Sequence, residues 1–91
     1  MTTKTPSMGT LIEAVAFAAD KHRDQRREDV AASPYINHPI ALANVLANEG
    51  GVTNLTALCA AVLHDTVEDT DTTEKELTDR FGSDIARGVM E

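Results

Sequence analysis

The sequence contains few of the residues that build disulfide-rich or aromatic cores. It has one cysteine, no tryptophan, and only three aromatic residues, Phe17, Tyr35 and Phe81. A single cysteine excludes a disulfide within the chain, and the apolar surroundings of Cys59 predict a buried, reduced thiol in an intracellular protein. With so little aromatic volume, the core must be built from Ala, Leu, Val and Ile, and this composition favours helices packed on helices.

Basic residues and long apolar runs are also scarce. The chain carries 8 Lys and Arg against 15 Asp and Glu, for a formal net charge of −7. This charge argues against nucleic-acid or anionic-membrane binding, because both require a protein to neutralise phosphates. No run of 18 apolar residues occurs and residues 1–9 lack an apolar segment, so we expect no membrane span and no signal peptide. The sequence therefore predicts one small cytoplasmic domain.

The charges that are present fall into two groups. Four of the 8 basic residues lie between positions 21 and 27, and seven of the 15 acidic residues lie between 65 and 79. The first segment suits an anion and the second a cation. A simpler interpretation is that both are solvated helix ends whose charges oppose the helix dipole.

Periodicity and capping signals predict an all-α fold of about five helices, with residues 1–9 as a flexible tail and residues 10–91 as the domain. The expected helices run from about 10 to 25, from Pro39 to Gly50-Gly51, from Asn54 to about 64, from Thr73 to Gly82, and from Ser83 or Asp84 onward. Capping boxes are expected at Thr10/Glu13 and Thr73/Glu76.

Two of these helices have informative apolar patterns. The second should direct Leu42, Val45 and Leu46 inward. The third, LTALCAAVLHD, is apolar on nearly every side, so we expect it at the centre of the fold. Residues 66–72 are expected to form a polar acidic loop.

His38, His64 and Asp65 are candidate metal ligands. They can converge if the second and third helices are antiparallel neighbours. Imidazole and carboxylate ligands suit Mn²⁺, Fe²⁺ or Zn²⁺, and Glu68 or Asp69 could then orient or deprotonate a bound water. Taken singly, the His-Asp pair is an ordinary helix end, Glu68-Asp69 is a solvated loop, and His22 is a packing or helix-end histidine.

The combination resembles a known family. The segments AVAFAADKHRDQRRED, SPYINHPIALANVLANEGG and ALCAAVLHDTVEDTDTTEKELTDRFG are similar to the HD-domain (p)ppGpp hydrolases, especially the small homologues related to the metazoan SpoT homologue. The resemblance implies a helical HD fold and Mn²⁺-dependent removal of the 3′-pyrophosphate from guanosine 3′,5′-bis(diphosphate).

The resemblance also implies roles for individual residues. His38 matches the family's first metal ligand, and His64 and Asp65 match its HD pair. Glu68 and Asp69 match the ED motif that activates the nucleophilic water.

Three arginines are the expected nucleotide contacts. Arg27, in QRR, matches the arginine that packs against guanine, a contact suited to a planar guanidinium. Its neighbours Arg26 and Arg23 are expected to attract a polyanionic nucleotide. Glu28 departs from the pattern, because the family usually has a basic residue there.

The resemblance covers about half of the family domain and implies a fourth ligand, an aspartate, that this chain does not contain. We therefore expect poor Mn²⁺ binding and weak or absent activity from these 91 residues. One alternative is hydrolysis of another nucleotide such as NADPH. Another is a non-catalytic remnant that self-associates through apolar surface around Leu77, Phe81, Ile85 and Val89.

Overall fold

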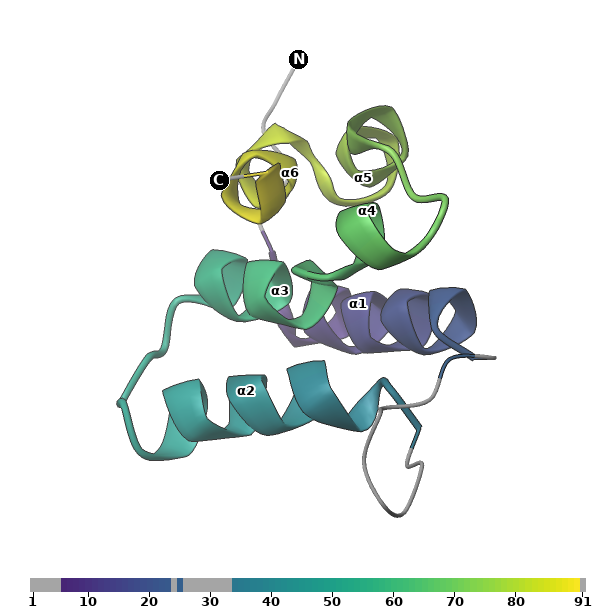
Figure 1. Ribbon diagram of the computed structural model, residues 1–91. Helices are drawn as coiled ribbons and strands as arrows, with labels where there is room; N and C mark the ends of the chain where they lie inside the picture. Colours follow the sequence, from purple (N-terminus) through teal and green to yellow (C-terminus); the bar gives the residue numbers. More distant parts are fainter. Residues whose placement is uncertain (1–5, 24, 26–33, 91) are drawn as a thin grey trace.

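The computed structural model describes residues 6–23, 25 and 34–90 (Figure 1). Its helices are α1 (Met8–Lys21), α2 (Asn37–Asn48), α3 (Leu55–Leu63), α4 (Thr66–Asp69), α5 (Glu74–Phe81) and α6 (Ser83–Met90). Five of these have eight or more residues and α4 is a single turn. No strand occurs in the described ranges, which confirms the predicted all-α class. The longest described helix has 14 residues, and none is both long and apolar enough to cross a membrane.

Helix α3 lies at the centre, as its sequence predicts. It packs against α1, α2 and α6, which surround it on different sides (Figure 1). Its buried residues include Val62, Leu63 and Cys59. Cys59 is a free cysteine with no exposed surface, and burial raises the pKa of its thiol.

Helices α5 and α6 close the core from the other side. Phe81 of α5 meets Phe17 of α1 edge to face, with ring centroids 5.4 Å apart. The apolar surface expected for a self-associating remnant is buried instead, since the exposed fractions of its residues lie between 0% and 7%. Those residues are Leu77, Phe81, Ile85 and Val89. The prediction that these residues are exposed is wrong because α5 and α6 pack on each other and α6 packs on α3.

Helix α2 carries the exposed apolar residues instead. Leu42 is 39% exposed and Val45 is 46% exposed, which contradicts the prediction that both point inward. Leu46 is half-buried, and Pro39 is the one residue of α2 in the buried class. The reason is that α2 packs mainly against α3 on the outside of the bundle, so it has one covered side.

Side-chain caps fix where several helices begin. The box at the start of α1 joins Ser7 and Thr10 and not Thr10 and Glu13, so α1 begins at Met8, inside the segment expected to be a tail. It ends at Lys21, four residues earlier than expected. The cap predicted at Asn54 is confirmed, and so is the Thr73 half of the Thr73/Glu76 box, since each side chain accepts a backbone N–H of its helix. Helix α2 begins at Asn37, which leaves Pro39 in the first turn, where a missing N–H is tolerated.

The segment expected to be an acidic loop contains α4. The buried hydroxyl of Thr66 donates to the carbonyl of Leu63 at 2.7 Å, and the N–H of Asp69 donates to the carbonyl of Asp65 at 3.0 Å. These bonds turn the chain directly after α3 and begin a new helical turn. Asp65 and Asp69 therefore lie one turn apart on a defined backbone.

Gly82 is expected to be required at the end of α5. Its φ of 93° and ψ of 162° place it in a region that is essentially restricted to glycine. We expect Gly82→Ala to lower the free energy of unfolding by about 1–3 kcal/mol, measured by urea denaturation. Gly9→Ala is the control, because Gly9 lies within α1 and alanine favours a helix. Equal stability of Gly82→Ala and the unmodified chain would contradict the argument.

Candidate active site

Asp65 lies at the centre of a group of polar side chains between α3 and α4. Its side chain is 13% exposed. Oδ1 lies 2.9 Å from His64 Nδ1, and Oδ2 lies 3.7 Å from His38 Nε2. His38 is at the beginning of α2 and Asp65 follows the end of α3, so the packing of these two helices brings them together. The structure thus places two of the predicted ligands, His38 and His64, next to the carboxylate of the third, Asp65.

Tyr35 connects this carboxylate to a second one. Its hydroxyl lies 2.9 Å from Asp65 Oδ2 and 2.9 Å from Asp69 Oδ2. The pKa of Tyr35 is raised, first by burial of the phenol and then by the hydrogen bonds and negative charges of the two aspartates. Tyr35 was not among the predicted site residues. A usable signal was present, because Tyr35 lies three residues before His38 in the turn that leads into α2.

His22 and Gln25 support Tyr35 from the end of α1. His22 is buried, as expected for a packing histidine, and its ring lies 4.7 Å from the ring of Tyr35 at an interplanar angle of 30°. His22 Nδ1 lies 2.8 Å from Gln25 Oε1. Gln25 Nε2 donates to the backbone carbonyl of Asp69. His22 and His38, which precede and follow Tyr35 in the sequence, differ in exposure. His22 is buried and His38 is exposed.

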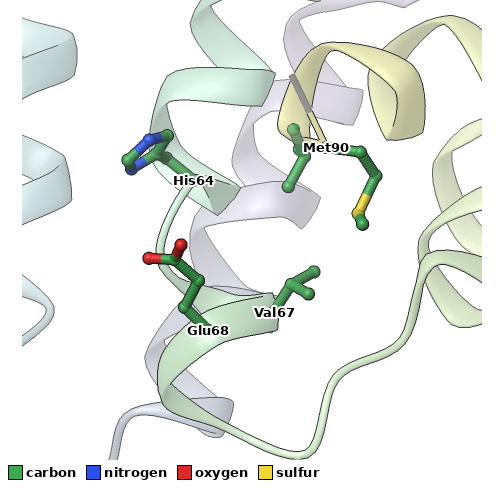
Figure 2. Close-up of a pocket in the computed structure, with 5 residues that line it drawn as sticks. His64, Val67, Glu68 and Met90 are labelled. Atoms are coloured by element: carbon green, nitrogen blue, oxygen red, sulfur yellow. The ribbon is translucent and has the colours of Figure 1, made fainter.

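Glu68 lies on the surface beside His64. A small open pocket is lined by His64, Val67, Glu68, Val89 and Met90 (Figure 2). The side chains of His64 and Glu68 extend to the same side of the chain, with Val67 and Met90 on the other (Figure 2). Glu68 is therefore exposed near the imidazole of His64, whereas Asp69 is tied to Asp65 through Tyr35.

Comparison with known proteins assigns the family. Residues 14–91, most of the chain, match the HD domain. The chain belongs to the HD-domain family. Hydrolases with this domain are generally metal-dependent.

The HD domain of this chain is similar to characterised relatives along nearly its whole length. It is 54% identical over 84 residues to the Danio rerio guanosine-3′,5′-bis(diphosphate) 3′-pyrophosphohydrolase MESH1, covering 92% of this chain and 47% of the relative. It is 56% identical over 81 residues to the Homo sapiens MESH1, covering 89% of this chain and 45% of the relative. The predicted resemblance is confirmed.

A solved structure gives the same result for the fold. The structure is described as a metazoan ortholog of SpoT that hydrolyses ppGpp, and it matches this chain with a TM-score of 0.88 and 40% sequence identity. The match covers 96% of this chain and 48% of the solved chain. The chain therefore spans about half the length of these three relatives.

The donor set of this HD domain fits a divalent transition metal. Two imidazoles and a carboxylate suit Mn²⁺, Fe²⁺ or Zn²⁺. At metal–ligand distances of about 2.0–2.2 Å, two ligands of one ion lie roughly 3–4 Å apart. The 3.7 Å between His38 Nε2 and Asp65 Oδ2 is in this range. His64 directs its Nδ1 to Asp65 Oδ1. Within residues 6–23, 25 and 34–90, no three His, Cys, Asp or Glu side chains are arranged as a metal cluster, so the fit is one of donor chemistry and of the spacing between His38 and Asp65.

The predicted nucleotide-binding arginines are only partly described. Arg26 and Arg27 lie outside the described residues. Arg23 is exposed near the end of α1, where Nη1 lies 2.9 Å from Asp20 Oδ1. Lys21, from the same basic segment, pairs with Asp71 at 3.3 Å and Glu76 at 3.4 Å. The basic and acidic segments, expected to hold separate ions, therefore also contact each other.

Proposed function

We propose that this HD domain supplies the metal-binding and water-activating part of a (p)ppGpp 3′-pyrophosphohydrolase. The substrate is guanosine 3′,5′-bis(diphosphate), and the reaction removes its 3′-pyrophosphate. Mn²⁺ as the ion and the cytoplasm as the location belong to this proposal. The observation that carries it is the placement of His38, His64 and Asp69 around Asp65, in a chain similar to proteins named for this reaction.

The proposed ligands are His38, His64 and Asp65. A divalent ion, when bound, polarises a phosphoryl group and lowers the pKa of water. Asp65 supplies the negative charge between the two imidazoles. Its low exposure strengthens these interactions, because charges interact more strongly away from bulk water.

Asp69 is the proposed orienting or proton-accepting group for the attacking water. It lies one helical turn beyond Asp65, and the shared hydroxyl of Tyr35 holds its carboxylate toward the same place. Glu68, on the exposed side next to His64, is the second acidic group of the proposal. Both carboxylates add negative charge around the proposed cation site.

The nucleotide is proposed to contact the basic segment that follows α1. Arg27 packs against guanine in this proposal, and Arg26 and Arg23 attract the phosphates. Arg23 is exposed, so its guanidinium is accessible to a nucleotide from solvent. This local positive charge also counters the net charge of −7 that a polyanion meets on approach.

Replacement of Asp69 tests the catalytic part of the proposal. We expect Asp69→Asn to lower the rate of pyrophosphate release from ppGpp by about 10²–10⁴-fold, the usual contribution of a general base. The rate is measured with Mn²⁺ in the chain fused to the remaining part of the Danio rerio relative, with and without the substitution, and is quantified by ion-exchange chromatography of the nucleotide products. Asp79→Asn is the matched control, since that carboxylate is 62% exposed on α5 and pairs with Lys75. Equal rates for Asp69→Asn and the unmodified chain would contradict the assignment.

The substrate is tested by parallel assays with ppGpp, NADPH and a generic phosphodiester. Because the chain spans about half of its relatives, we expect weak turnover by the chain alone. Turnover should rise when the chain is fused to the remaining part of the Danio rerio relative. Preference for ppGpp in both proteins supports the proposal. Preference for another substrate, or no pyrophosphate release by either protein, refutes it.

A further inference from the structure

The hydroxyl of Tyr35 is the one group in the described site that touches both aspartates. Its oxygen lies 2.9 Å from Oδ2 of Asp65 and 2.9 Å from Oδ2 of Asp69. A phenol has a single proton, so at any moment it donates to only one of the two carboxylates. Two carboxylates near one another repel, and a shared donor offsets part of that repulsion.

The hydroxyl of Tyr35 is a hydrogen-bond donor toward the aspartates. An ionised carboxylate only accepts a hydrogen bond, so the proton in each contact comes from the phenol. The distance of 2.9 Å to each aspartate lies toward the long end of the range for an O–H···O hydrogen bond.

The ring of Tyr35 is held in place independently of its hydroxyl. His22, which is 1% exposed, stacks on the ring, and the N–H of Tyr35 donates to the carbonyl of Gln25 at 3.1 Å. The carbonyl of Asp69 can only accept, so Gln25 Nε2 donates to it and Gln25 Oε1 accepts from His22 Nδ1. The end of α1, the turn before α2, and α4 are thereby joined through Tyr35 and Gln25.

We propose that Tyr35 is a positioning residue of this site, whose hydroxyl fixes the Asp65 carboxylate for a divalent cation and the Asp69 carboxylate beside it. This inference rests on the proposed function, in which Asp65 is a ligand and Asp69 orients water. Hydrogen bonds to ligating carboxylates orient them, and their loss typically reduces metal affinity or activity by about 10–100-fold.

Tyr35→Phe tests the proposal, because it keeps the stacked ring and removes only the hydroxyl. We expect Mn²⁺ affinity to fall about 10–100-fold, measured by isothermal titration with MnCl₂. In the ppGpp assay we expect kcat to fall while KM changes little, because the hydroxyl contacts Asp65 and Asp69, the carboxylates proposed to bind the metal and orient the water. Far-UV circular dichroism and the unfolding midpoint establish that the variant is folded.

Two further variants separate the hydroxyl from the ring and from nonspecific effects. Tyr35→Leu removes both, so a loss in Tyr35→Leu without a loss in Tyr35→Phe would assign the role to the ring and overturn the proposal. Thr78→Val is the control for loss of a hydroxyl, because Thr78 is exposed on α5. It should bind Mn²⁺ like the unmodified chain.

The Mn²⁺ titration keeps the two proposals separate. If the unmodified chain binds Mn²⁺ but releases no pyrophosphate from ppGpp, alone or fused, the proposed function fails, and Tyr35 is still judged by metal affinity. If Tyr35→Phe matches the unmodified chain in Mn²⁺ affinity and in kcat, the positioning role is refuted and the proposed function stands. If the protein fused to the remaining part of the Danio rerio relative binds no Mn²⁺, the positioning role is refuted as well.

Discussion

Asp65→Asn is expected to remove Mn²⁺ binding and hydrolysis together. Asn has nearly the same shape as Asp but no negative charge, and Asp65 is the residue that contacts His38, His64 and Tyr35 at once. The loss should exceed the roughly 10–100-fold cost of removing a hydrogen bond to a ligand, because here the ligand itself is lost. Mn²⁺ affinity is measured by calorimetric titration, and pyrophosphate release from ppGpp is measured in parallel.

The same substitution on a distant carboxylate provides the comparison for Asp65→Asn. Asp79→Asn makes the same change in atoms and in charge at an exposed residue of α5. It should leave Mn²⁺ affinity unchanged. Asp65→Asn with Mn²⁺ affinity within a factor of two of the unmodified chain would refute the ligand role of Asp65 and, with it, the proposed metal centre.

Phe81→Ala is expected to be the most destabilising core substitution. Phe81 is 1% exposed and meets Phe17 edge to face. Phe→Ala in a core costs about 3–5 kcal/mol. At about 0.05–0.15 kcal/mol per residue, a chain of 91 residues has roughly 5–14 kcal/mol of total stability, so the substitution removes a large part of it. Urea unfolding followed by circular dichroism measures the change.

Ile12→Ala is the matched surface control for Phe81→Ala. Ile12 lies on α1 and is 60% exposed, and alanine has a higher helix propensity than isoleucine. The free energy of unfolding of the Ile12→Ala variant should stay within about 0.5 kcal/mol of that of the unmodified chain, as is usual for surface substitutions. A Phe81→Ala change no larger than the Ile12→Ala change would show that α5 does not close the core as described.

The helices were largely predictable because their signals are local. The caps at Asn54 and Thr73 and the end at Gly82 each depend on residues within one turn of the chain. The central position of α3 followed from an apolar sequence with no polar side. The first cap was assigned wrongly because Ser7 and Thr10 compete with Thr10 and Glu13 for one helix start, and both patterns are acceptable locally.

Exposure was less predictable because it depends on which helices lie nearby. Leu42 and Val45 have an inward pattern, yet they are 39% and 46% exposed. Leu77 and Ile85 were expected to be exposed, yet α5 and α6 pack together and bury them. Periodicity identifies an apolar face but does not identify the segment that covers it.

The sequence by itself determined most of the helices, the HD-domain resemblance and the candidate ligands, because these are carried by residue types at short spacings. Only the tertiary structure decided that His38 reaches Asp65 and that one hydroxyl joins Asp65 to Asp69. Tyr35 is 30 residues from Asp65 and 34 from Asp69. Contacts across such separations depend on how α1, α2 and α3 pack, and no pattern within a single helix specifies that packing.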